Sequence, residues 1–165
     1  MADISHHRLA IRLVKRRGKL PLLICTRADA SSTIGEISVG PEHDLAHFVV
    51  ETTLGLRRAF YGLVAEGMNI EDFSVPGGAQ RLQLPEEAVR AEFIVGLVQA
   101  ERRCDRSFAD FNDELKKAIG GARHPLPPPP AISDAHLTII RKGLEDLLQK
   151  WSALPPDGAI ELAFQ

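Results

Sequence analysis

Apolar and polar residues alternate at both ends of the chain, and this alternation limits the folds that the chain can adopt. Residues 8–15, "RLAIRLVK", and residues 159–165, "AIELAFQ", each carry a large apolar side chain at every second position. This period is typical of a strand with one covered face. Two half-buried strands most easily hide their apolar sides against the same helices, so we expect both ends of the chain to join one sheet.

Two more strands are expected early in the chain, at residues 20–27 and 34–39, the first of them joined to the N-terminal strand by a hairpin turn at Gly18. Helical patterns fill most of the remaining sequence, at residues 41–53, 56–67, 85–104, 107–120 and 133–153. Such segregation predicts an α+β fold, in which a four-stranded, mainly antiparallel sheet of three N-terminal strands and the C-terminal strand is covered by a helical layer.

Two segments are expected to lack a regular element. Residues 68–84 contain "PGG" and show no sustained period, which predicts a surface loop. Residues 124–131, "HPLPPPPA", have the composition of a stiff proline-rich connector. The length of 165 residues suits one core, so we expect residues 1–165 to form a single domain with this connector inside it.

Charge and composition argue against several classes of partner. The net charge is −2 and only 5% of the residues are aromatic, which makes nucleic acid an unexpected partner. No stretch approaches the ~20 apolar residues of a membrane span, and the N-terminus lacks a signal-peptide pattern, so we expect a cytoplasmic protein that does not bind membranes. Cys25 and Cys104 are too few for a disulfide framework and are expected to be reduced thiols.

A narrow polar stripe interrupts the first expected helix. Residues 40–51, "GPEHDLAHFVVE", place His43, Asp44, His47 and Glu51 together on a helix whose other sides are largely apolar. The two histidines are one turn apart, about 6 Å along the axis, so both rings can reach one metal ion.

The pentapeptide "HDLAH" resembles the HExxH motif of zinc metallopeptidases, with Asp44 in the place of the glutamate. In that family the two histidines bind zinc and the glutamate is the general base, so the resemblance implies His43 and His47 as ligands of zinc or another divalent metal, with Asp44 as the base. An HDxxH core is also similar to a motif of a ubiquinone-biosynthesis family. Both resemblances are confined to these five residues.

The resemblance leaves a third ligand to be found. Glu51 is two turns, about 12 Å, from His43, which places it as a partner that orients His47 or as an alternative base rather than as a ligand. Glu66 follows the motif at a distance similar to that of the third zinc ligand in thermolysin-like metallopeptidases. The hypothesis is therefore a small metal-dependent enzyme, hydrolytic in action, with His43, His47 and Glu66 as ligands.

Interpretations without a metal remain open. The stripe could be an ordinary solvated face on which carboxylates pair with imidazoles. It could also border a binding or oligomerisation module, in which Arg27 and Asp29, together with the helix start at Gly40, receive an anionic small molecule or a partner chain. A second copy of the chain, forming a homodimer across a sheet edge, is one such partner. The small-molecule substrate or ligand is not defined by the sequence.

Overall fold

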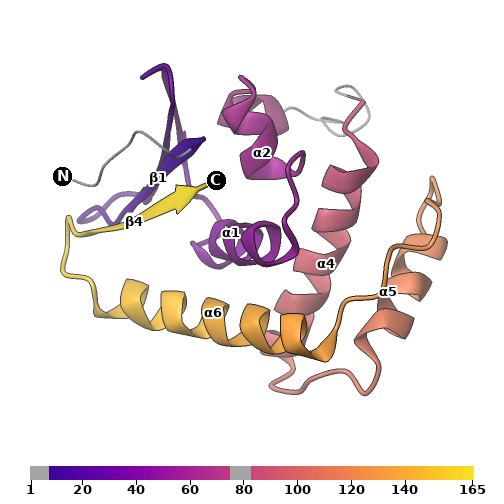
Figure 1. Cartoon of the computed structure of the whole chain (residues 1–165). Helices are drawn as coiled ribbons and strands as arrows, with labels where there is room; N and C mark the ends of the chain where they lie inside the picture. The colour runs from indigo at the N-terminus through magenta and orange to yellow at the C-terminus, as the bar shows by residue number, and fades with distance from the viewer. Residues whose placement is uncertain (1–7, 75–82) are drawn as a thin grey trace.

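The computed structural model describes residues 8–74 and 83–165 and confirms the predicted α+β fold. Four strands form one sheet in the order β3-β2-β1-β4, and all neighbouring strands are antiparallel. The bounds of the strands are Leu9–Val14 for β1, Leu22–Arg27 for β2, Ser32–Glu36 for β3 and Ala159–Phe164 for β4. Figure 1 shows β4 beside β1, so that the two ends of the described chain lie in the same sheet.

The pairing of β1 with β4 joins the two alternating segments of the sequence. Leu9 lies opposite Phe164, and Leu13 lies opposite Ile160. All four side chains are buried, as is Ile11 between Leu9 and Leu13, whereas Ala10 and Arg12, on the other face of β1, are partly covered or exposed. The alternation in the sequence therefore reports which face of the sheet is covered by helices.

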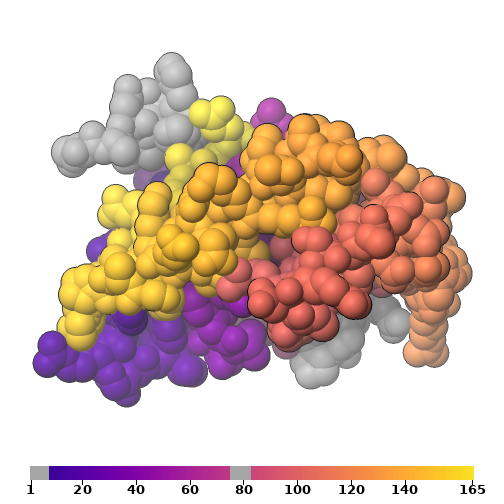
Figure 2. All heavy atoms as spheres, turned by 90° about the horizontal axis from the view of Figure 1, so that it is seen from below, coloured from indigo at the N-terminus to yellow at the C-terminus, as the bar shows by residue number. Residues whose placement is uncertain are grey.

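Helix α1, Glu42–Leu54, lies at the centre of the helical layer and packs against three other helices. Figure 1 shows α6 running beneath it, and Figure 2 shows α6 spread across the lower face of the molecule. Within the described stretches, no helix has the length and apolar content needed to cross a membrane. The other helices are α2 (Phe60–Ala65), the short 3-10 helix η2 (Ile70–Ser74), α4 (Glu86–Arg103), α5 (Phe111–Gly120) and α6 (Asp134–Ala153).

Most helix ends follow the sequence signals, but α2 and α5 begin later than expected. Pro41 precedes α1, and Gly55 ends it in the left-handed conformation, at φ 66°. Ser133 caps α6 through its side chain, which accepts from the backbone N–H of His136. Helix α5 begins later than expected because Asp110, rather than Ser107, provides its cap.

Two other segments differ from the expectations. Strand β3 covers residues 32–36 instead of 34–39, because a tight turn links Arg27 N–H to the Ser31 carbonyl at 2.8 Å and pairing resumes at once. Part of the expected loop 68–84 forms η2, which packs on β3 so closely that a Cβ at Gly35 would lie 2.6 Å from Ile70 Cγ2. Residues 75–82 of that loop lie outside the described residues. The proline-rich residues 124–131 form neither helix nor strand and join α5 to α6.

Candidate metal centre

The two histidines of the HDLAH segment lie one turn apart on the same side of α1. Their ring centroids are 4.7 Å apart and the rings meet edge to face. His47 is buried, with 2% of its side chain exposed, whereas 40% of the His43 side chain is exposed. The pair therefore runs from the interior of the protein to its surface.

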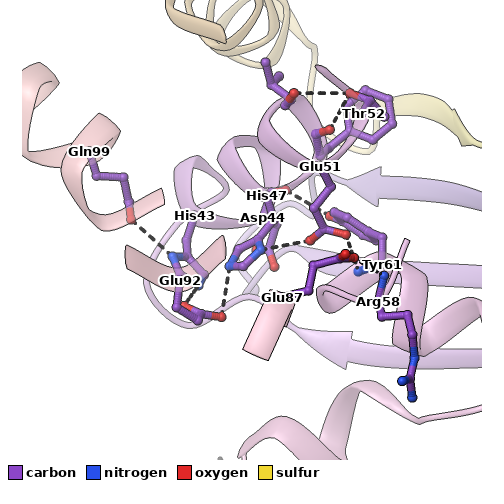
Figure 3. Close-up of polar contacts among 12 residues, drawn as sticks. His43, Asp44, His47, Glu51, Thr52, Arg58, Tyr61, Glu87, Glu92 and Gln99 are labelled. Atoms are coloured by element: carbon purple, nitrogen blue, oxygen red, sulfur yellow. Dashed lines mark hydrogen bonds and ion pairs between the residues drawn. The ribbon is translucent and has the colours of Figure 1, made fainter. Parts of the chain in front are cut away.

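Helix α4 brings a carboxylate to both rings. Glu92 Oε1 lies 3.1 Å from His47 Nε2, and Glu92 Oε2 lies 3.8 Å from His43 Nε2. Figure 3 shows the Glu92 carboxylate facing the two histidines. One ligand atom from each of the three side chains lies within 4.8 Å of the other two, so the group could hold a metal ion.

The remaining nitrogen of each imidazole is held by its own acceptor. His43 Nδ1 lies 3.1 Å from the side-chain oxygen of Gln99, and His47 Nδ1 lies 3.0 Å from Glu51 Oε1. A neutral imidazole whose Nδ1–H donates such a bond has its lone pair on Nε2. When both rings are neutral, as metal binding requires, both lone pairs point to the side of α1 where Glu92 lies, as in metal sites whose histidines are oriented by hydrogen bonds.

His47 Nε2 is buried and makes no hydrogen bond within residues 8–74 and 83–165. Glu92 Oε1 is close enough, at 3.1 Å, but it is not aligned with the ring nitrogen as a hydrogen bond requires, so the contact is an ion pair. A buried polar atom without a directed partner is uncommon in folded proteins. A cation between His47 and Glu92 would satisfy both groups.

Glu51 connects the histidine pair to the start of α2. Its side chain is fully buried, and Oε2 accepts the backbone N–H of Tyr61 at 3.0 Å (Figure 3). Burial raises the pKa of Glu51, while its hydrogen bonds from His47 and from the α2 backbone act in the opposite direction. Glu51 is thus an internal acceptor that fixes the His47 ring and the first turn of α2 together.

The carboxylates also control the protonation of His47. Burial alone would lower the pKa of His47, but the hydrogen bond to Glu51 and the close negative charges of Glu51 and Glu92 outweigh it and raise the pKa to about 9. Burial likewise favours a higher pKa for Glu92, but the two histidines outweigh it and lower that pKa. Without a metal, His47 therefore carries a proton between two carboxylates, and a divalent cation would take the place of that proton.

The candidate ligands open into a cavity of about 490 Å³. Its lining includes Asp44, whose side chain comes from the helix turn between the two histidines. Burial raises the pKa of Asp44, and the nearby histidines only partly offset this effect. Asp44 can therefore exchange a proton closer to neutral pH than an exposed aspartate does.

Glu66, the third ligand expected from the sequence, lies outside this group. Its carboxylate contacts Arg8 at 3.5 Å and Arg58 at 3.4 Å, and it is partly exposed. Glu92 lies beside the histidines instead. Glu92 and Gln99 are seven residues apart and so share one side of α4, where both meet His43, but this spacing alone does not show in the sequence that the side faces α1.

The residues of the expected anion site lie at opposite ends of β3. Arg27 and Asp29 lie at the hairpin between β2 and β3, whereas Gly40 follows the opposite end of β3. The Arg27 guanidinium donates to the backbone carbonyls of Val64 at 2.7 Å and Met68 at 2.6 Å. Asp29 accepts from the N–H and hydroxyl of Ser31 and so closes the turn. The Asp29 side chain is thus engaged in its own turn, and the Arg27 side chain holds the end of α2 and the residues after it against the sheet.

The chain matches no protein-family model, and neither the curated proteins nor the solved structures contain a match to it.

Proposed function

We propose that the protein is a metal-dependent hydrolase whose zinc, or other divalent metal, is held by His43, His47 and Glu92. The observation that carries this proposal is the orientation of the rings. Both Nε2 atoms face one carboxylate, while both Nδ1 atoms are anchored to side-chain oxygens. Two histidines and a glutamate are a donor set of catalytic zinc, which leaves a coordination position for water or substrate.

Bound zinc would supply Lewis acidity, which polarises a carbonyl or phosphoryl oxygen. The chain's own groups would supply the rest of the chemistry. Asp44 lines the same cavity and its raised pKa suits a group that takes a proton from an attacking water and returns it to the leaving group. Glu51 and Gln99 hold the two rings in place, so they act as positioning residues.

Metal content tests the first half of this proposal. Full-length protein purified without a histidine tag should retain, or take up from one equivalent of zinc, about one metal ion per chain, measured by elemental analysis after dialysis. His47→Ala and Glu92→Gln should lose this metal. Glu66→Gln is the matched control, because it removes an exposed carboxylate outside the group, and it should bind metal as the wild type does.

Hydrolysis tests the second half. A panel of chromogenic esters, amides and phosphoesters should reveal an activity that is removed by a chelator and restored by zinc, cobalt or manganese. Asp44→Asn should bind metal normally and lose most of the turnover, because it keeps the size of the side chain but accepts no proton. A protein that binds no divalent metal, or whose Glu92→Gln variant binds it as tightly as the wild type, would contradict the proposed centre.

A further inference from the structure

The cavity beside the metal centre has two kinds of wall. One end carries the candidate ligands together with Asp44. The other walls are apolar and come from several parts of the fold, namely the sheet and the residues that follow β3, the helices α2 and η2, and Leu84, two residues before the start of α4. Their apolar side chains are Leu23, Ile37, Val39, Phe60, Ile70, Phe73 and Leu84.

The apolar wall begins directly beside a candidate ligand. The Phe60 ring lies 5.6 Å from the His47 ring and 4.8 Å from the Phe73 ring, measured between centroids, and the two phenylalanines meet edge to face. A substrate whose reactive bond lies at the metal centre would therefore place the atoms next to that bond against aromatic carbon. Burial of such atoms is favourable by about 0.8 kcal/mol per methylene, a factor of about four in affinity.

Among the lining residues of this cavity that the structure describes, none carries a fixed positive charge. Among the described lining residues there is no lysine and no arginine, and the charged side chains other than the histidines are the carboxylates of Glu36, Asp44 and Glu92. Glu36 is paired with Arg16, 2.7 Å away, which is not one of the lining residues. A carboxylate or phosphate on the part of a substrate away from the metal would lose its water without gaining a cationic partner among these described residues.

We infer that the substrate of the proposed hydrolase carries an uncharged, apolar group, such as an alkyl acyl chain or an aryl ring, next to the bond that is cleaved. This inference rests on the proposed metal centre and adds the chemical class of the substrate. The apolar group occupies the space bounded by Phe60, Ile70 and Phe73, and the hydrolysed bond lies at the end that carries His47 and Glu92.

Hydroxamic acids test this inference, because the hydroxamate group binds zinc while its substituent samples the cavity. Full-length zinc-loaded protein would be titrated with acetohydroxamate, hexanohydroxamate, a hydroxamate of the same length ending in a carboxylate, and one ending in an amine. We expect the affinity to rise with each added methylene that reaches the apolar wall, by about fourfold at most. The carboxylate probe should bind at least about tenfold more weakly than hexanohydroxamate.

Two variants locate the effect. Phe73→Ser should remove most of the gain that hexanohydroxamate shows over acetohydroxamate. Val39 lines the cavity but is 84% exposed, so Val39→Lys adds a cation without disturbing the core. Val39→Lys should tighten the carboxylate probe, and the uncharged Val39→Gln is its matched control.

The outcomes separate the two proposals. If zinc does not bind, or zinc-loaded protein fails to bind acetohydroxamate, the metal centre itself is wrong. If acetohydroxamate binds but chain length has no effect, or if either charged probe binds more tightly than hexanohydroxamate, the metal centre stands and the apolar substrate class is overturned.

Discussion

The Nδ1 atom of His47 and the Oε1 atom of Glu51 lie 3.0 Å apart, one helical turn from each other, in a part of the protein that excludes water. A carboxylate in such a place costs free energy unless its oxygens are paired. Here one oxygen faces the imidazole and the other accepts a backbone N–H of α2. The same contact therefore stabilises the fold and sets the direction in which the opposite ring nitrogen points.

Metal affinity should depend steeply on pH. Because the pKa of His47 is about 9 without metal, a cation must displace a proton at neutral pH. Zinc affinity should rise by about tenfold per pH unit as pH increases toward 9 and then level off. Competition titration with a chromophoric chelator between pH 6 and 9 would measure this. An affinity that is constant across the range would show that His47 is not a ligand.

The thermal stability of the metal-free protein should fall as pH rises, whereas metal affinity should increase. A raised histidine pKa contributes stability that is complete below the unfolded pKa of about 6.5 and is lost as pH rises through about 9. Thermal unfolding with chelator present should therefore show a lower melting temperature at pH 9.5 than at pH 6.5. Zinc-loaded protein should keep its melting temperature over the same interval. Equal pH responses of the two forms would contradict the exchange of a proton for a metal.

Glu51→Gln should weaken the metal centre without removing a ligand. Glutamine keeps the size of the side chain and one acceptor oxygen, but the negative charge beside His47 is lost. We expect the pKa of His47 to fall below about 9, and an NMR titration of its ring proton would measure this change. Metal affinity should fall by about 10- to 100-fold, the usual effect of a residue that orients a ligand.

Gln99→Leu should act on the other histidine in a similar way. Its side-chain oxygen is the acceptor for His43 Nδ1, so leucine leaves this ring without an orienting bond. We expect zinc affinity to fall by about 10- to 100-fold, while the helix and its packing persist. Gln149→Leu is the control, because Gln149 donates to Glu145 on the exposed side of α6. A Gln99→Leu variant with wild-type affinity would exclude this positioning role.

Two glycine substitutions should have opposite effects on stability. A Cβ at Gly62 would lie 1.9 Å from the Arg57 carbonyl oxygen, so Gly62→Ala must displace the first turn of α2 and should cost about 3 kcal/mol. Nothing lies within 4 Å of a Cβ at Gly96 in α4, so Gly96→Ala should stabilise by about 0.5–1 kcal/mol. Urea unfolding measures both. Gly62→Ala should also shift Tyr61 away from Glu51 and so lower metal affinity.

The sheet could be predicted from the sequence because its signals are local. Alternation at residues 8–15 and 159–164, the turn at Gly18 and the proline before α1 each report a constraint within a few residues, and the structure confirms the fold that they imply. The exact limits of β3 could not be predicted in this way. They depend on the geometry of the turn between Arg27 and Ser31, and the sequence alone is compatible with turns of several lengths at this place.

The site was only partly accessible from the sequence. His43 and His47 are related by one helical turn, and that relationship is contained in the spacing itself. Glu92 comes from another helix, and its position depends on how α4 is rotated against α1, which no local pattern encodes. Glu66 follows the histidines at the spacing of a third zinc ligand, but spacing along the chain does not fix position in space, and the structure places Glu66 with two arginines.

The place of β1 between β2 and β4 has a consequence for synthesis on the ribosome. Strand β2 follows β1 within a few residues, but Leu9 pairs with Phe164 on its other side. At about 5 to 20 residues per second, the ribosome adds β4 roughly 8 to 30 s after β1. During that interval one edge of β1, with its apolar side chains, lacks the strand that later covers it, and unpaired edges recruit other chains. A nascent chain that stalls within α6 therefore holds every candidate metal ligand but exposes an aggregation-prone strand edge.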